Sequence, residues 1–276
     1  MPELPEVETV RRGLAEVLEG RRLSKVIARR EDLRWPFPED FSQRLTSRQV
    51  RLVDRRAKFL VIRLDDDIVW IAHLGMSGRF SIYTEKPPPE GIHDHVIIET
   101  DEGVTLRYND PRRFGFMDLT TADSLPDYPL LKSIGPEPLD TSFTPEVLGK
   151  SLRDRTAPIK SALLNQHIVA GLGNIYVCEA LYGARISPKR KARSVRGGRA
   201  KDLHKAIIDV LSRAIQAGGS SLRDHRRPDG EFGYFQQKFL AYGRTGENCG
   251  RCGAGHKIRQ ISQAGRTTFY CPNCQR

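Results

Sequence analysis

The 276-residue sequence has few cysteines, two tryptophans and three methionines, and it contains no long hydrophobic run. No apolar stretch approaches the roughly 18 residues that a membrane-spanning helix needs. The amino-terminal segment is charged where a secretion signal would be hydrophobic. Four of the five cysteines lie within residues 249–274, a distribution unlike the disulfide framework of a secreted protein. These absences exclude a membrane protein and lead us to expect a cytosolic, globular one.

Acidic residues are scarce in the last third of the chain. Residues 185–276 hold 20 of the 45 Lys and Arg but only 6 of the 34 Asp and Glu, a net charge of +14, whereas the remainder sums to −3. A surplus of this size repels itself unless an anionic partner approaches, and phosphate backbones are the most common such partner. The alternative is a solvated face that only keeps the protein soluble.

The amino terminus has the pattern of a helix. Hydrophobic residues from Val7 to Leu18 recur at helical spacing, Pro5 suits a first turn and Gly20 suits an end. Glu3 and Glu6 then lie at the positive end of the helix dipole, which is stabilising in itself.

The pattern changes after this helix. From about residue 22 to 119 we predict a β-sandwich or barrel from short strand-like runs: "KFLVIRL", "IVWIAHL", "GRFSIY", "HVIIET", "GVTLRY" and "FGFMDL", with "DDD" and "DEG" as turns. The segment "SIGPEPLD" at 133–140 is typical of an interdomain linker. Beyond it we predict helices over 144–153, 158–168, 174–182 and 199–217.

The spacing C-x2-C-x18-C-x2-C joins two cysteine pairs: Cys249 with Cys252, and Cys271 with Cys274. Two such pairs supply four thiolates to a tetrahedral Zn²⁺, which leaves no open coordination position, so one structural zinc ion is expected. Two disulfides are the alternative. Between the pairs the sequence predicts a β-hairpin that turns at Ala264 and Gly265, which places Arg266 near its tip. The fifth cysteine, Cys178, is expected to be a buried small hydrophobic residue.

Pro2 follows the initiator methionine. Removal of Met1 would expose a secondary amine, and an amine that attacks a sugar carbon forms an imine that promotes elimination. A proline imine is permanently cationic. Pro2 alone is weak evidence, but acidic neighbours and a basic partner surface favour strand scission after base removal.

These motifs together resemble the formamidopyrimidine-DNA glycosylases over essentially the whole chain. The resemblance is carried, in order, by "MPELPEVETV", "RRAKFL", "HLGMSGRF", "HDHV", "RYNDPRRFG", "GPEPL", "IKSALLNQHIVAGLGNIY", "GYFQQKFLAYGR" and the cysteine pairs. It implies an α+β protein with an amino-terminal β-sandwich domain that begins with a helix. A carboxy-terminal helical domain with a helix-two-turns-helix element and a zinc β-hairpin would follow. The expected domains are residues 1–134, 135–240 and 241–276.

The resemblance also implies catalytic roles. Pro2 would be the Schiff-base nucleophile, Glu3 the acid that assists ring opening and base loss, and Glu6 a supporting residue. Lys58 would bind phosphate and serve β-elimination, and Arg266 would do the same for δ-elimination. For Lys58 the alternative is a strand lysine whose head reaches the solvent.

Further residues correspond to DNA contacts of the family. Met76, Arg112 and Phe114 match the side chains that fill the space left by an everted nucleotide. From the residues alone, Met76 and Phe114 would more often belong to a core.

DNA contacts are also implied for His93, Arg155 and Lys160, and a phosphate contact is implied for Asn174. Asn174 is also a plausible helix N-cap after a tight glycine turn. The segment "GGSSLRDHRRPDGEFGYF" at 218–235 corresponds to the loop that encloses the everted base. It is more basic than the family pattern, and this bears on base selectivity.

The resemblance therefore implies a bifunctional glycosylase and abasic-site lyase of base-excision repair that acts on 8-oxoguanine and formamidopyrimidines in duplex DNA. We expect a monomer in the bacterial cytosol or nucleoid. One alternative is an enzyme like endonuclease VIII, which prefers oxidised pyrimidines. Another is a zinc-ribbon nucleic-acid-binding protein without catalysis.

Overall fold

The computed structural model describes residues 1–220 and 233–276. Contacts divide the chain into two units. The first unit is Met1–Lys132 with Ala217–Tyr234, and the second unit is Ser133–Gln216 with Phe235–Arg276. The basic segment at 224–230, which the sequence relates to base enclosure, lies outside the described residues.

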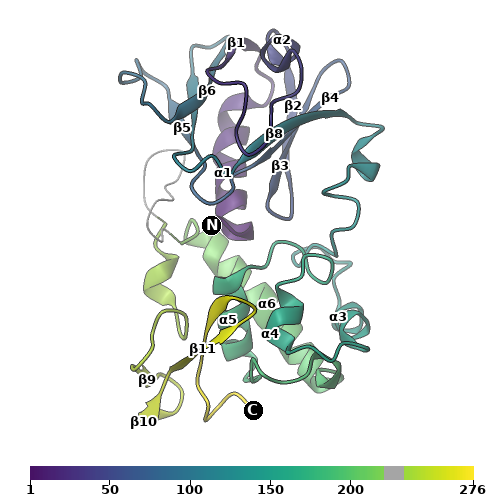
Figure 1. Cartoon of the computed structure of the whole chain (residues 1–276), viewed down its shortest axis with the longest axis vertical. Coiled ribbons are helices and arrows are strands. Elements are labelled where there is room, and N and C mark those ends of the chain that lie inside the picture. Colours follow the sequence, from purple (N-terminus) through teal and green to yellow (C-terminus); the bar gives the residue numbers. More distant parts are fainter. Residues whose placement is uncertain (221–232) are drawn as a thin grey trace. The chain divides into compact units, whose positions relative to one another are not determined.

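The first unit begins with the predicted helix, α1 (Leu4–Leu18), which is purple in Figure 1. Pro5 lies in its first turn, and Gly20 follows its end with a φ of +81°. The buried face of α1 packs against the strands β2 and β3. Both helix boundaries that the sequence predicted are confirmed.

Two antiparallel four-stranded sheets form the body of the first unit. One has the order β1 (Leu23–Ala28), β6 (Asp94–Thr100), β7 (Thr105–Asn109) and β5 (Arg79–Tyr83). The other has the order β2 (Val50–Arg56), β3 (Phe59–Leu64), β4 (Ile68–His73) and β8 (Phe116–Thr121). A short helix, α2 (Phe41–Leu45), lies between β1 and β2 in the chain.

The six quoted runs all form strands, and most of their apolar residues are buried. The "DDD" turn between β3 and β4 has Asp66 and Asp67 at positive φ, as a tight hairpin requires. Side chains of both sheets and of α1 share one hydrophobic core, in which Trp70 is fully buried. The predicted sandwich with its amino-terminal helix is confirmed.

The second unit is helical and ends in two β-hairpins. Its helices are α3 (Pro145–Leu152), α4 (Ile159–Leu163), α5 (Asn174–Gly183) and α6 (Gly198–Gln216). The hairpin strands are β9 (Asn248–Cys249), β10 (Gly253–Lys257), β11 (Arg259–Gln263) and β12 (Arg266–Tyr270). Single 3-10 turns complete the described elements: η1 (Leu125–Asp127), η2 (Ala192–Ser194) and η3 (Phe235–Lys238).

The helix predicted over 158–168 was wrong in its extent, because α4 ends at Leu163. Asn165 explains the early end, since its side-chain oxygen accepts a hydrogen bond from the backbone N–H of His167 at 2.9 Å. Local bonds of this kind compete with helical ones. The shortened helix leaves a structured turn before α5.

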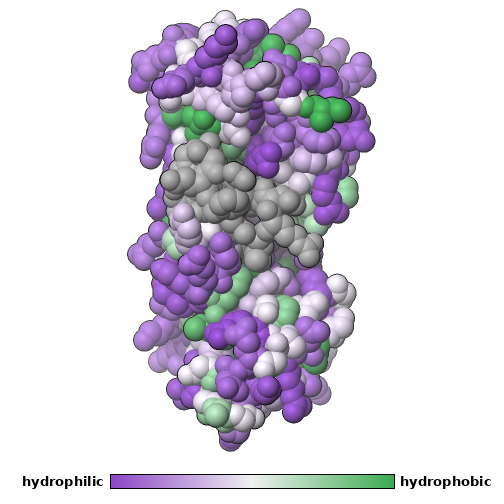
Figure 2. Space-filling model, turned by 90° about the vertical axis from the view of Figure 1, so that its left-hand side faces the viewer, coloured by the Kyte–Doolittle hydropathy of each residue, from purple (hydrophilic) through white to green (hydrophobic). Residues whose placement is uncertain are grey.

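None of the helices in residues 1–220 and 233–276 is long and apolar enough to cross a membrane. The face shown in Figure 2 is mainly hydrophilic, and its hydrophobic residues form small separate patches.

Candidate active site and nucleic-acid-binding surface

Pro2 and Glu3 stand directly before α1. Pro2 is buried, and Glu3, the N-cap residue, is only 3% exposed. The backbone N–H of Glu3 donates a hydrogen bond to Glu6 Oε2 at 2.9 Å, within a capping box that joins the two glutamates. The helix start therefore fixes the residue that follows Pro2.

Glu6 also binds a distant part of the first unit. Its Oε1 accepts hydrogen bonds from the backbone N–H of Ser220 at 2.8 Å and from the Ser220 hydroxyl at 3.0 Å. Gly219 makes this approach possible, because its φ is +78° and a Cβ there would lie 3.1 Å from Glu6 Oε1. The family resemblance implies a supporting role for Glu6, but nothing in the sequence points to Ser220 as its partner.

Lys58 lies at the turn between β2 and β3, the two strands that contact α1. It is only 7% exposed, which does not fit a strand lysine that extends its head into solvent.

His73 on β4 accepts a hydrogen bond from the backbone N–H of Gly75 through Nδ1 at 3.0 Å. Burial, aided by the charges of Lys58 and Arg34, lowers the pKa of His73 to about 4, so its ring is neutral at pH 7.

Met76 and Phe114 are surface residues, each 42% exposed. Met76 follows β4 and Phe114 precedes β8, so two different loops present them. Arg112, also exposed, holds its guanidinium 4.7 Å from the centre of the Phe114 ring. The exposure excludes the core reading of Met76 and Phe114.

A fully buried carboxylate, Asp110, joins these two loops. Its Oδ1 accepts from the hydroxyl of Ser77 at 2.5 Å, and its Oδ2 accepts from the backbone N–H of Gly115 at 2.8 Å and from Tyr108 at 3.3 Å. The Ser77 hydroxyl in turn accepts from the backbone N–H of Arg112 at 3.2 Å. The motif "RYNDPRRFG" contains Asp110, but its pattern did not single this residue out.

Close backbone contact locks the same loops together. Gly75 has a φ of +60°, and a Cβ there would collide with the backbone of Phe114. His93 is exposed in the turn before β6, and its carbonyl accepts from the backbone N–H of Asp110 at 3.1 Å. The structure thus brings His93, Met76, Arg112 and Phe114 into one group of adjoining loops.

In the second unit, Lys160 is a fully buried residue of α4, and Arg155 is exposed before that helix. Asn174 is not the N-cap of α5, as the sequence suggested, because Gly173 occupies that position. The side-chain amide of Asn174 instead donates to the carbonyl of Thr267 on β12 at 2.9 Å. This bond fixes the start of α5 to the last hairpin.

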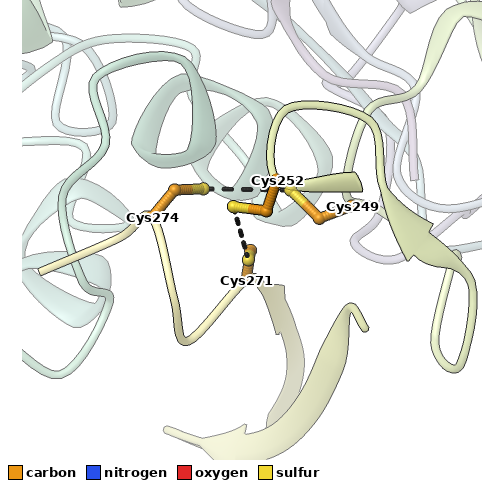
Figure 3. A group of neighbouring side chains, drawn as sticks. All are labelled: Cys249, Cys252, Cys271 and Cys274. Carbon is orange, nitrogen blue, oxygen red and sulfur yellow. Dashed lines mark hydrogen bonds between the residues drawn. The ribbon is translucent and has the colours of Figure 1, made fainter. Parts of the chain in front are cut away.

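Four cysteines of the second unit form a metal site, which Figure 3 shows. Their sulfurs all lie within 4.8 Å of one another; Cys249 and Cys274 are 3.9 Å apart, and Cys252 and Cys271 are 3.8 Å apart. Four thiolates about 2.3 Å from a tetrahedral Zn²⁺ lie about 3.8 Å apart, whereas disulfide sulfurs lie about 2 Å apart. The cluster therefore fits zinc, and the disulfide alternative is wrong.

Neighbouring groups orient the thiolates. The Tyr182 hydroxyl lies 3.2 Å from Cys249 Sγ, and the Arg251 guanidinium lies 4.6 Å from the centre of the Tyr182 ring. The carboxylate of Glu179, which sequence analysis missed, accepts backbone hydrogen bonds from Leu240, Ala241 and Tyr242. These contacts fasten the metal-binding segment to α5. Cys178 on the same helix is buried, as predicted.

Arg266 lies at the tip of the β11–β12 hairpin. Ala264 and Gly265 form the turn with φ angles of 50° and 68°, and Gln263 pairs with Arg266 across it. Positive φ at both turn positions is the type I′ geometry that suits a two-residue hairpin. The predicted turn and the exposed cation beside it are confirmed.

Three family descriptions match the chain in order. Residues 1–117 match the formamidopyrimidine-DNA glycosylase N-terminal domain, residues 134–226 its H2TH domain, and residues 246–276 a zinc finger found in FPG and IleRS. The formamidopyrimidine-DNA glycosylases of Rhodospirillum centenum and Ruegeria pomeroyi are 52% and 48% identical, and each match covers all of both chains.

Solved structures agree with these matches. Lactococcus lactis Fpg in complex with abasic-site DNA has a TM-score of 0.89 and 38% identity over 99% of both chains. A mutant of the same enzyme with THF-containing DNA has a TM-score of 0.90 and 39% identity over all of both chains.

The β-sandwich, the helix-two-turns-helix element and the four-cysteine hairpin define a DNA glycosylase of base-excision repair with one structural zinc ion. Within that class the chain belongs to the formamidopyrimidine-DNA glycosylase family.

Proposed function

We propose that this chain removes 8-oxoguanine and formamidopyrimidines from duplex DNA and then cleaves the abasic strand by β,δ-elimination. Lactococcus lactis Fpg has been solved with N7-benzyl-Fapy-dG DNA and with abasic DNA. The observation that carries the proposal is the placement of Pro2, buried at the start of α1 beside Glu3.

The chemistry begins when removal of Met1 frees the secondary amine of Pro2. The amine nitrogen attacks C1′ of the damaged nucleoside, the glycosidic C–N bond breaks, and the base leaves with a proton. Glu3 supplies the proton that opens the sugar ring. The product is a cationic imine between Pro2 and C1′.

The imine then acts as the electron sink for both eliminations. Loss of a C2′ proton breaks the C3′–O bond and releases the 3′ phosphate, and loss of a C4′ proton breaks the C5′–O bond and releases the 5′ phosphate. Hydrolysis of the imine returns the Pro2 amine. Lys58 assists the first elimination and Arg266 the second, because cations stabilise departing phosphate.

The DNA contacts follow from the loops of each unit. Met76, Arg112 and Phe114 enter the duplex and replace the everted nucleotide, because their exposed apolar and planar groups can stack with bases. His93, Arg155 and Asn174 contact the DNA strand. Lys160 was expected to contact it too, but this side chain is fully buried in α4 and does not reach the surface. We further propose the three-domain division at 1–134, 135–240 and 241–276, and a monomer that acts in the bacterial cytosol or nucleoid.

Borohydride trapping tests the nucleophile. The enzyme is incubated with an abasic duplex and borohydride, and the adduct is mapped by peptide mass spectrometry. We expect the adduct on Pro2 and a large loss of trapping in Pro2→Gly. An undiminished yield in that variant, or Met1 retained in fully active protein, would overturn the mechanism. A non-catalytic zinc-ribbon protein would give no adduct.

A second measurement tests the lesion class. Single-turnover cleavage is compared for duplexes that carry 8-oxoguanine or thymine glycol. Faster cutting of 8-oxoguanine is expected, and preference for thymine glycol would support the alternative that resembles endonuclease VIII.

A further inference from the structure

A basic groove lies in the second unit between α3, η2 and the start of α6. It encloses about 470 Å³, and the exposed cations that line it are Lys150, Arg153, Arg193, Arg196 and Lys201. Gly149, Gly197 and Ala200 also line it. These small residues leave room between the cations for a ligand. None of the phosphate-binding residues proposed above lines this groove.

The described residues offset little of the positive charge of the groove, because one carboxylate faces five cations. Within the described ranges, no ion pair engages any of its five cations. Its one acidic lining residue, Glu146, bonds to its own backbone N–H and to the Thr144 side chain, and these bonds, with the nearby charge of Lys201, lower the pKa of its carboxyl. In the first unit, by contrast, a single carboxylate, that of Glu8, forms ion pairs with Arg11, Arg12 and Arg55.

The groove is held in place by backbone hydrogen bonds. The N–H groups of Ala192 and Arg193 donate to the carbonyls of Ala157 and Arg155, each at 2.9 Å, and the N–H of Ile159 donates to the carbonyl of Arg190 at 2.7 Å. Ala192 is fully buried and Val195 nearly so. A solvated stretch that only aided solubility would not need these anchors. The structure therefore argues against a purely solubilising role for the cations of the groove.

The chemistry of the groove fits phosphate. Guanidinium groups bind phosphate oxygens in a bidentate manner, and three of the five cations are arginines. The 19-residue helix α6 starts at Gly198, beside the groove, and its first N–H groups add positive potential. Five exposed cations around one groove match a polymer of phosphates better than a single small anion.

We propose that the basic groove is a second DNA-binding surface, which contacts the phosphate backbone of duplex DNA outside the lesion site. The inference rests on one part of the proposed function, which is that a damaged duplex occupies the lesion site. Its contacts are independent of base sequence, and they let the enzyme hold undamaged DNA while its active site is occupied.

The test uses the full-length enzyme covalently trapped by borohydride on a short abasic duplex, so that its active site is blocked. A fluorescent undamaged duplex is then titrated against the purified adduct and followed by anisotropy at several salt concentrations. We expect saturable, salt-sensitive binding. Failure to form the adduct would count against the proposed function, whereas an adduct that binds no second duplex would overturn the groove proposal alone.

The variant R153Q/R193Q/R196Q removes the three arginine charges and keeps polar side chains. It should trap abasic DNA normally, bind the second duplex at least tenfold more weakly, and lower the slope of log K against log salt by about 2 to 3. The matched control R44Q/R51Q/K132Q removes three exposed cations of the first unit. Equal losses of affinity for the second duplex in both variants would show that only the net charge of the protein matters, and would overturn the proposal.

Competition identifies the ligand class. Undamaged duplex should displace the fluorescent duplex from the adduct far better than polyglutamate of equal charge. Equal displacement by polyglutamate would show that the groove binds acidic protein surfaces rather than phosphate, and would overturn the assignment to DNA.

Discussion

The two units hold their functional side chains by different means. In the first, Met76, Arg112 and Phe114 stand on loops fixed by the buried Asp110 carboxylate, beside the hydrophobic core of a β-sandwich. In the second, Arg266 stands on a hairpin next to a small apolar cluster that contains the metal thiolates. The difference teaches that a large core can position exposed residues through one polar network, whereas a short hairpin depends on its metal.

The two units also differ in how many of their arginines are held in ion pairs. Burial would raise the pKa of Glu8, but hydrogen bonds and ion pairs with Arg11 and Arg12 outweigh it, so the pKa is lowered. Such pairs offset the charge of Arg11, Arg12 and Arg55 in the first unit. The arginines of the basic groove have no such partners among the described residues, so their charge is available to a ligand.

Removal of the metal should have the largest effect. Cys252→Ser should lose zinc and more than 100-fold of abasic-strand cleavage, because structural zinc supplies about 10 kcal/mol or more to a small domain and the hairpin carries Arg266. The first unit should stay folded. Metal content, cleavage rate and calorimetric unfolding check this.

Cys178→Ala is the matched control, because it removes a buried thiol of the same unit but no metal ligand. It should keep one zinc ion per chain and its cleavage activity. Full activity in a zinc-free Cys252→Ser protein would break the comparison between the units.

Asp110→Asn should have the next largest effect. The amide places N–H groups where the carboxylate accepts, which costs about 2 to 3 kcal/mol of unfolding free energy. The loops that carry Met76 and Phe114 should loosen, so that a 2-aminopurine opposite the lesion reports slower, incomplete insertion.

Asp118→Asn is the control for Asp110. Asp118 also accepts from a tyrosine, Tyr128, at 2.6 Å, but it lies on β8 away from the Asp110 network. It should leave the insertion signal intact. Equal insertion defects in both variants would remove the positioning role from Asp110.

His73 should affect the free energy of unfolding of the first unit only at acidic pH. Because its folded pKa of about 4 lies below the ordinary 6.5, the unfolded chain takes up the proton first as the pH falls. Its stability contribution is complete above pH 6.5 and is lost towards pH 4, about 3 kcal/mol in all. Denaturant unfolding should show less of this loss in His73→Asn; identical pH profiles would refute it.

Exposed ion pairs should matter least in either unit. Arg30 pairs with Asp32 in the first unit, and Arg213 with Asp209 in the second, with both partners well exposed. Asp32→Asn and Asp209→Asn should each change the unfolding free energy by less than about 0.5 kcal/mol. A larger change in one unit, measured by urea unfolding, would show that surface charge also separates them.

Local sequence patterns predicted much of the fold. Short strand-like runs located six strands, Pro5 and Gly20 bounded α1, and the cysteine spacing identified the zinc site. The turn at Ala264 and Gly265 was predictable because few residues tolerate its backbone geometry. Each of these signals lies within one turn, helix or hairpin.

Predictions that needed a distant partner were less successful. Asn174 was interpreted as a helix cap, but its amide bonds to Thr267, 93 residues away. The partners of Glu6 and Glu179 were missed for the same reason, since Glu6 bonds to Ser220 and Glu179 to Ala241. A carboxylate in a helical pattern gives no sign of which backbone groups it will meet.

By itself the sequence determined the two-part architecture, the metal and the presence of Pro2 with acids beside it, because short-range spacing and side-chain chemistry encode all three. Only the tertiary structure decided that Met76 and Phe114 are exposed, that Lys58 is buried, that Asp110 joins two loops and that five cations line one groove. Burial and partnership depend on which strands and helices meet, and chain folding sets those meetings over long sequence distances.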